Sequence, residues 1–159
     1  MKELKVEIGN YKIGRNSLLT AFGLGSCVGI FLYDAAEKIG ALGHVLLPGR
    51  TDDSSVIKQR KYCFNLIEMM LEELMQEGAQ KESLVAKIAG GAHMFQFFSG
   101  GDRQPIGLKN VHSVKLKLKE EQVPLISQDV GKEFGRTLIA NTNTGILVVK
   151  TILHGTREI

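Results

Sequence analysis

The stretch Gly23-Leu24-Gly25-Ser26-Cys27-Val28-Gly29 joins two apolar runs and decides how they fold. The runs on either side, 18–23 and 27–33, each have the length and composition of a buried strand. The glycines between them accept backbone angles that other residues resist, and they let another chain come close. A thiol on such a bend is accessible to a substrate backbone. Cys27 therefore has two interpretations, a nucleophile or a small apolar residue of the core.

The strand after the bend is followed by a second one that turns back along it. A polar turn at 34–38 leads into the run 39–47, which ends at Pro48-Gly49. These features predict an antiparallel hairpin. Such a hairpin brings His44 back towards Cys27, where it would serve as a general base. The alternatives are that His44 is a hydrogen-bonded strand residue, or that His93 is the base.

The remaining pattern predicts strands mixed with two main helices. A half-exposed strand is expected at 4–8, with 11–13 pairing back on it, and a helix from Ser54 or Ser55 to Glu77. That helix has an apolar stripe of Val56, Cys63, Ile67, Met70, Leu71 and Leu74, and Gly78 ends it. The second helix is expected at Asn110–Gln122, with Val111, Val114 and Leu118 inward. Further strands are expected at 84–89, 125–126, 137–140 and 146–149, the last two joined by the turn Asn143-Thr144-Gly145.

Because helices do not separate the strands regularly, the order favours an α+β fold, a layered sandwich of mixed β-sheets flanked by two main helices. A length of 159 residues predicts one domain over residues 1–159. The tail 151–159 has no clear pattern. A loop at 90–107 contains Phe95, Phe97 and Phe98, which are candidate anchors for a partner or else core residues.

The composition excludes several classes of function. A net charge of +3 is too small to indicate nucleic acid, and the basic runs 58–61 and 115–119 fit solvated helix faces. The two cysteines make no disulfide framework. The longest apolar stretch, 21–33, is shorter than the ~20 residues of a membrane span, and charges interrupt the N-terminal apolar residues. We therefore expect a soluble cytoplasmic protein.

Other candidate sites carry weaker signals. Cys63 falls on a helix stripe and is expected to be a core residue, while His112 and His154 are expected outside the site. No pair of histidines has zinc-ligand spacing, so neither a metal nor a cofactor is expected. The spaced glycines 23, 25 and 29 do not open a helix, as a dinucleotide loop requires. Ser26 lacks the G-x-S-x-G frame of a serine nucleophile.

Several motifs together resemble the chemoreceptor glutamine deamidase family (CheD) of bacterial and archaeal chemotaxis. They extend over most of the chain: Gly23 to Val28, Gly40 to Pro48, Lys87 to Ala92, Ile106 to Val111 and Asn143 to Gly145. The resemblance implies a fold similar to the catalytic domains of deamidating toxins. It also implies that receptor glutamines are converted to glutamates, and that receptor methyl esters are hydrolysed in some members.

By the same resemblance, Cys27 is the nucleophile and His44 its acid and base, and backbone near Gly25 and Ser26 holds the oxyanion. The family's third catalytic residue is a threonine six residues before the cysteine, and Ala21 holds that position here. Thr20 lies one residue earlier, and a shift of one residue turns a strand side chain to the other face. Either a bulge restores Thr20, or another group takes this role or the role is lost.

The resemblance implies two protein partners. Members of the family act on methyl-accepting chemotaxis receptors, to which a cytoplasmic protein would be recruited at the membrane. They also bind a CheC-type chemotaxis phosphatase. An alternative function is therefore a mainly non-catalytic adaptor that binds receptors and this phosphatase. The substitution of Ala21 for the threonine and the phenylalanine loop favour this alternative.

Overall fold

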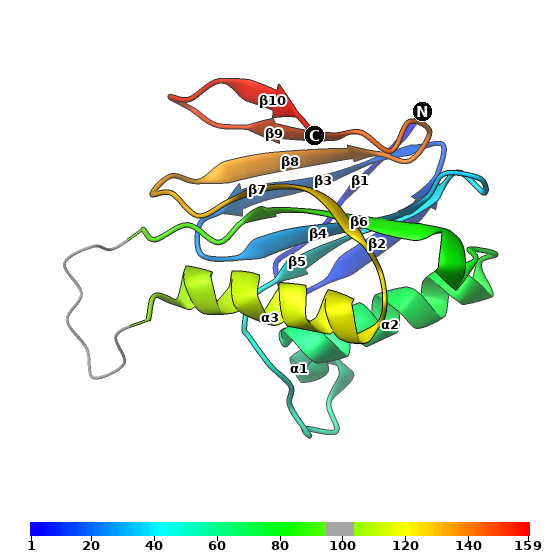
Figure 1. Ribbon diagram of the computed structural model, residues 1–159, viewed down its shortest axis with the longest axis horizontal. Coiled ribbons are helices and arrows are strands. Elements are labelled where there is room, and N and C mark those ends of the chain that lie inside the picture. The colour runs from blue at the N-terminus through cyan, green and yellow to red at the C-terminus, as the bar shows by residue number, and fades with distance from the viewer. Residues whose placement is uncertain (95–103) are drawn as a thin grey trace.

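Ten strands form two sheets in the computed structural model, which describes residues 1–94 and 104–159 (Figure 1). Within this part, sheet A has the order β1 (Lys2–Lys5), β3 (Ser17–Leu24), β8 (Arg136–Asn141), β9 (Leu147–Lys150) and β10 (Thr156–Glu158). Sheet B has the order β2 (Tyr11–Arg15), β5 (Ile39–Val45), β4 (Val28–Asp34), β6 (Leu84–Gly90) and β7 (Leu125–Val130). Both sheets are mixed, because β1–β3 and β6–β7 are parallel.

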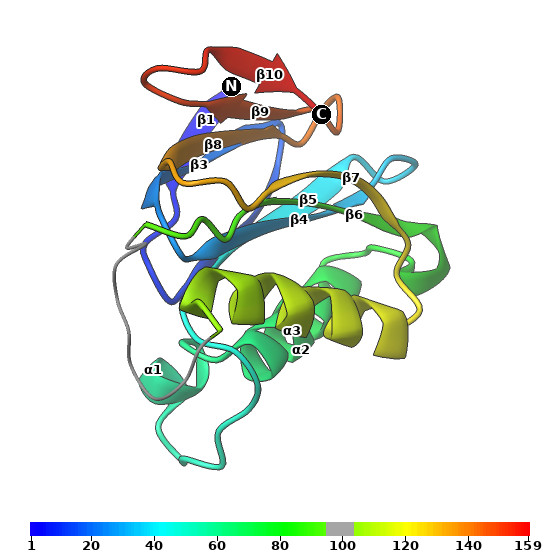
Figure 2. The same ribbon diagram turned by 60° about the vertical axis from the view of Figure 1, so that its left-hand side comes forward.

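The helices lie on one side of the molecule, against sheet B. They are α1 (Val56–Gln59), α2 (Cys63–Gln76) and α3 (Ile106–Glu120), with a short 3₁₀ turn, η1, at Lys81–Ser83. Figure 2 shows sheet B between the helices and sheet A. The predicted α+β sandwich with two main helices is therefore confirmed. Its likeness to toxin domains stays a prediction.

Two apolar cores hold these layers together, and β4 contributes to both. Val28, Ile30 and Leu32 pack towards the helices, whereas Phe31 and Tyr33 pack between the sheets. Side chains alternate across a strand, so a strand buried on both faces needs an uninterrupted apolar sequence. This requirement explains the run that follows Cys27.

The predicted hairpin is confirmed with a defined register. β4 and β5 are antiparallel, and Gly29 lies opposite His44 while Val28 lies opposite Val45. The second predicted hairpin, between β8 and β9, also forms. The pairing of 11–13 with the first strand is wrong, because β2 instead pairs with β5 in the other sheet.

The single helix expected from Ser55 to Glu77 is broken. Ser55 does cap α1, but Tyr62 is extended and makes a bridge to Leu47. The bridge requires non-helical backbone at this point, and its hydrogen bonds join Lys61 and Cys63 to the backbone of Leu47. As a result Val56, which was expected in the apolar stripe, is exposed.

Four smaller differences concern the second half of the chain. α3 begins at Ile106, directly after Pro105, rather than at Asn110. Lys117 is buried against Glu68 and Glu121 instead of lying on a solvated face. β7 extends to Val130, and the tail forms β10. No helix in the described part of the chain is long and apolar enough to span a membrane.

Candidate active site

The bend at 25–27 carries the chain from sheet A to sheet B, because β3 and β4 belong to different sheets. The pairing of β3 with β8 shifts between Ala21 and Leu24, and Gly23 has a φ of +66°. Cys27 lies at the end of the bend, 6 % exposed, within the core between the sheets. The thiol is therefore close to the surface but largely shielded from water.

Three successive carbonyl groups of the bend are held by hydrogen bonds. The Gly25 carbonyl accepts from Ala92 N–H (2.9 Å), and the Cys27 carbonyl accepts from Gly91 N–H (2.8 Å). The Ser26 carbonyl accepts from Nδ2 of Asn110 (3.0 Å). No peptide bond in the described chain is cis, and a trans peptide directs its N–H opposite to its C=O. The N–H groups of Ser26 and Cys27 therefore point away from these anchors.

Glycine is required where the 90–92 segment runs beside the bend. A Cβ on Gly90 would lie 2.3 Å from the carbonyl oxygen of Cys27. Gly91 has a φ of +67°, and a Cβ there would lie 2.2 Å from Val111. Both positions exclude side chains, so the Gly90-Gly91 pair is what allows this backbone to hold the bend.

His44 lies on the same face of sheet B as Cys27. It is opposite Gly29, two residues beyond Cys27, and residues two apart on extended backbone share a face. Cys27 and His44 are thus diagonal neighbours across the hairpin, and no hydrogen bond joins the thiol to either ring nitrogen in this structure. Both side chains face the space between the sheets, on the side opposite the helices.

Burial determines the charge state of both groups. His44 is 2 % exposed, and neither ring nitrogen has a hydrogen-bond partner among the described residues. Desolvation lowers the pKa of His44 to about 4. The Val6 backbone, which lies near the ring without hydrogen-bond geometry, and Glu7 act in the opposite direction. Desolvation also raises the pKa of Cys27 to about 11, so the resting pair is a neutral thiol and a neutral imidazole.

The structure does not bring Thr20 to Cys27. Ala21 is fully buried in the core between the sheets, and Thr20, on the other face of β3, lines a cavity of about 810 Å³. The bulge in β3 follows Ala21, so it does not restore the hydroxyl. The residue of β3 that faces the core between the sheets is therefore Ala21, which presents only a methyl group.

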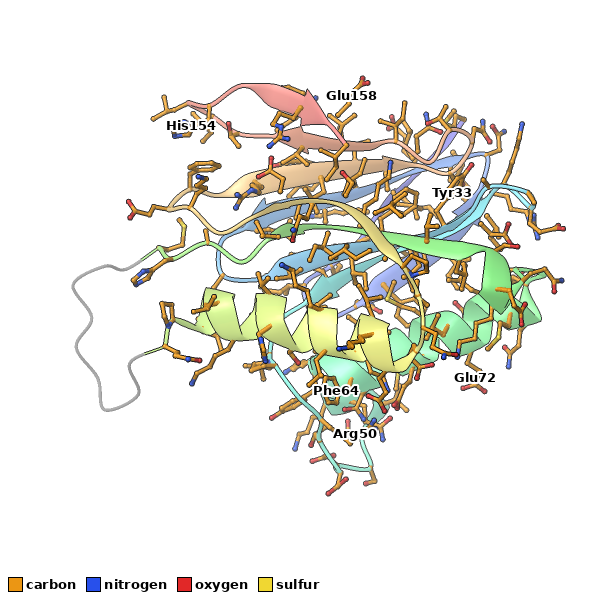
Figure 3. All side chains as sticks on the ribbon, in the orientation of Figure 1. Tyr33, Arg50, Phe64, Glu72, His154 and Glu158 are labelled. Carbon is orange, nitrogen blue, oxygen red and sulfur yellow. The ribbon has the colours of Figure 1, made fainter. Side chains whose placement is uncertain are left out.

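The other sequence candidates lie elsewhere. Cys63 is fully buried at the start of α2, and desolvation raises its pKa to about 11. His112 is exposed on α3, and His154 stacks on Phe134 near the β9–β10 turn (Figure 3). His93 is half-buried beyond β6, where its N–H bonds to the Lys132 carbonyl. The candidate anchors Phe95, Phe97 and Phe98 lie outside the described residues.

Two side-chain clusters near the bend were not found from the sequence. Asn110 bonds the carbonyls of both Ser26 and Leu46. Arg136 is buried, pairs with Asp129 (3.0 Å) and donates to the Gly131 carbonyl (3.0 Å), beside the end of β6. A polar residue on the buried face of a predicted helix was the available signal for Asn110. Nothing local distinguishes Arg136.

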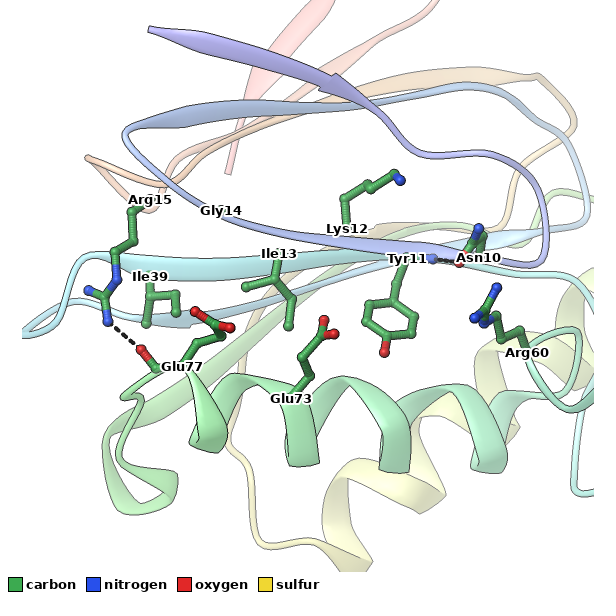
Figure 4. A pocket seen from close by; sticks show the side chains of 10 residues that line it. All are labelled: Asn10, Tyr11, Lys12, Ile13, Gly14, Arg15, Ile39, Arg60, Glu73 and Glu77. Carbon is green, nitrogen blue, oxygen red and sulfur yellow. Dashed lines mark hydrogen bonds between the residues drawn. The ribbon is translucent and has the colours of Figure 1, made fainter. Parts of the chain in front are cut away.

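A second cavity, of about 580 Å³, lies between β2 and α2 (Figure 4). Tyr11, Glu73 and Glu77 line it, and Arg15 closes one end through a hydrogen bond to the Glu77 carbonyl. The lining contains none of the candidate catalytic residues. In the described part of the chain, no three His, Cys, Asp or Glu side chains are grouped so as to hold a metal ion.

Comparison with known proteins gives consistent matches. The family model described as "CheD chemotactic sensory transduction" matches residues 46–151, a segment that begins after Cys27 and His44. Curated relatives extend over the rest. A Clostridium botulinum protein named "Probable chemoreceptor glutamine deamidase CheD" is 42 % identical over 100 % of this chain and 99 % of the relative. A Syntrophomonas wolfei protein of the same name is 40 % identical over 99 % of both chains.

Proposed function

Because the chain belongs to the CheD family of chemotactic sensory transduction, we propose that it hydrolyses the side-chain amides of chemoreceptor glutamines to glutamates. We also propose that residues 1–159 form the single domain that carries this activity. The observation that carries the proposal is the placement of Cys27 and His44 on one face of the β4–β5 hairpin, beside a glycine-rich bend. A thiol with a neighbouring imidazole is the arrangement that nucleophilic acyl chemistry needs.

In the proposed reaction, the Cys27 sulfur attacks the amide carbon of the glutamine as His44 takes the thiol proton. The carbon–nitrogen bond then breaks, and His44 returns the proton to the departing ammonia. Water next attacks the thioester with His44 again as base. The carbon–sulfur bond breaks, and the thiolate takes its proton back from His44. The product is a glutamate side chain, which adds one negative charge to the receptor.

The backbone of the bend supports the charge that develops during this attack. The N–H groups of Ser26 and Cys27 point away from the carbonyl anchors of the bend, and the proposal places the substrate oxygen on that side. Backbone donors fixed before the reaction stabilise an oxyanion without reorganising. Of the residues expected to hold the oxyanion, Gly25 contributes its carbonyl to the anchoring. The donors are Ser26 and Cys27.

The neutral resting pair requires the proton transfer to be coupled to attack. With pKa values of about 11 for Cys27 and about 4 for His44, forming the ion pair in advance would cost on the order of 10 kcal/mol before their mutual attraction is counted. The neutral thiol is therefore the form that meets the substrate. His44 accepts the proton only as the new carbon–sulfur bond forms.

The experiment that tests the proposal follows receptor glutamines directly. Cytoplasmic fragments of a chemoreceptor are incubated with the protein, and conversion of glutamine to glutamate is measured by mass spectrometry. We expect conversion by the unmodified protein and by Cys63→Ala, but none by Cys27→Ala. The Cys63 variant is the matched control, because both cysteines are buried but Cys63 lies on the far side of sheet B. Equal conversion by both variants would exclude Cys27 as the nucleophile.

A second function is an adaptor at the receptors that also binds a CheC-type phosphatase. Ala21, which is buried in the core between the sheets, favours this function, because the hydroxyl of the family's third catalytic residue is absent at that position. In this function the protein is cytoplasmic and is recruited to membrane receptors. Co-purification of the Cys27→Ala variant with receptor fragments and the phosphatase tests it, and no retention of either partner would refute it.

A further inference from the structure

Asn110 is a fully buried polar side chain on the first turns of α3, and the proposed reaction does not use it. Its Nδ2 donates to the Ser26 carbonyl (3.0 Å) and to the Leu46 carbonyl (3.1 Å). Ser26 directly precedes Cys27, and Leu46 lies two residues after His44. One amide group therefore joins the two segments that carry the proposed catalytic pair.

The bond to Ser26 fixes more than the carbonyl. The Ser26 C=O and the Cys27 N–H belong to one planar peptide unit and point in opposite directions. Holding the oxygen therefore sets the direction of the Cys27 N–H. Backbone groups of Ala92 and Gly91 hold the carbonyls on either side, so Asn110 is the side chain through which this direction is set.

The other end of the amide argues against a purely structural role. Oδ1 of Asn110 is buried and has no hydrogen-bond partner among the described residues. A buried acceptor without a partner costs folding free energy. An asparagine at this position is therefore not optimal for stability alone. What Asn110 contributes is the two hydrogen bonds that its Nδ2 donates.

We propose that Asn110 is a positioning residue, which aims the Cys27 N–H at the oxyanion formed on the substrate carbonyl. The inference rests on the proposed function, since it concerns the same nucleophile. Asn110 touches no reacting atom and acts through the Ser26–Cys27 peptide. Its removal is expected to slow the reactions of Cys27 that pass through an oxyanion and to spare those that do not.

Two reactions of the same thiol separate these cases. With p-nitrophenyl acetate, the Cys27 sulfur bonds to the carbonyl carbon through an oxyanion, p-nitrophenolate leaves, and the thiol proton passes to the buffer. With iodoacetamide, the sulfur displaces iodide at a saturated carbon, and no oxyanion forms. The ratio of acylation to alkylation at Cys27, measured by mass spectrometry, therefore isolates the oxyanion contribution.

We expect Asn110→Asp and Asn110→Ala to lower the acylation rate by about 10- to 100-fold and to leave alkylation within about twofold. The Asp variant has nearly the same shape but has no N–H to donate. The matched control is Ser113→Ala. Ser113 is also buried on α3, but its Oγ accepts from the Gly49 N–H, away from the bend. The control is expected to change neither rate.

Three outcomes would overturn the inference. The first is an unchanged ratio in both Asn110 variants, and the second is an equal fall of the two rates. The third is labelling of Cys63 as fast as Cys27 in both variants, which would show that Asn110 holds the fold. The receptor assay separates this inference from the proposed function. Acetylation of Cys27 without glutamine conversion by the unmodified protein would refute only the proposed function.

Discussion

At the scale of single residues, the sequence predicted the identities of the candidate pair but not their charge state. Cys27 and His44 were placed together by the glycine-rich bend and the hairpin that follows it. Their pKa values depend on how deeply the finished sandwich buries them, which no local pattern encodes. The same limit applies to Asn110, whose partners come from two distant segments.

His44 makes stability depend on pH. Its folded pKa of about 4 lies below the ordinary value of 6.5, so the unfolded chain binds the proton more tightly. With respect to this residue, the free energy of unfolding has its full value above pH 6.5 and decreases as pH falls towards 4. Between pH 7 and pH 5 we expect the free energy of unfolding to fall by about 2 kcal/mol from this residue.

Urea unfolding at the two pH values measures this effect, with His44→Asn as the comparison. The variant should lose most of the difference between pH 7 and pH 5. His112→Asn, at an exposed position of α3, is the control and should retain it. A His44→Asn variant as sensitive to pH as the unmodified protein would contradict the assigned burial.

Thr20 provides a test with no expected effect on catalysis. Its side chain lines the cavity on the outer face of β3, away from the core that contains Cys27. Thr20→Val keeps the shape and removes the hydroxyl, so kcat for receptor deamidation should stay within about twofold. A loss of a hundredfold or more would mean that Thr20 reaches the site after all.

At the scale of elements, the prediction succeeded where the signal was local. The bend, the β4–β5 hairpin and the apolar stripe of α2 all follow from spacing along the chain. The break between α1 and α2 does not, because it depends on a bridge between Tyr62 and the distant Leu47. Tertiary hydrogen bonds overrode a helical pattern there.

Gly107, in the first turn of α3, packs closely against the 91–92 backbone that holds the bend. A Cβ on Gly107 would lie 2.4 Å from the carbonyl oxygen of Ala92. Gly107→Ala should therefore displace the 91–92 backbone, destabilise the protein by about 1–3 kcal/mol and lower kcat as the bend shifts. Thermal unfolding and the deamidation assay measure the two effects.

Gly155→Ala is the matched control for this substitution. Gly155 has a φ of +78°, but a Cβ there meets no atom within 4 Å, and the residue lies in the β9–β10 turn. Gly155→Ala should lower the free energy of unfolding by about 1–2 kcal/mol through backbone strain alone and leave kcat unchanged. Equal loss of kcat in both variants would show that stability, rather than the position of the bend, controls the rate.

At the scale of the whole molecule, the layered α+β class followed from the order of elements, but the pairing of strands between sheets did not. The chain crosses from one sheet to the other at the bend, and β2 pairs with β5 although β1 and β3 belong to sheet A. Such pairings are set by contacts distant in sequence. The proposed site lies at one of these crossings.

The order of the layers predicts that truncating side chains on the two faces of β8 lowers the free energy of unfolding by different amounts. Leu138 is fully buried between the sheets and fills the space beside Gly29, whereas Ile139 faces the outer side of sheet A and is half-buried. Leu138→Ala should destabilise the protein by about 2–5 kcal/mol. Ile139→Ala should cost clearly less. Denaturant unfolding compares the two, and equal losses would contradict the layer order.

The most direct test of the central claim is mass spectrometry of chemoreceptor fragments incubated with the protein and its two cysteine variants. We expect glutamine-to-glutamate conversion by the unmodified protein and by Cys63→Ala, and none by Cys27→Ala. Conversion by Cys27→Ala at the unmodified rate, or no conversion by any of the three proteins, would contradict it.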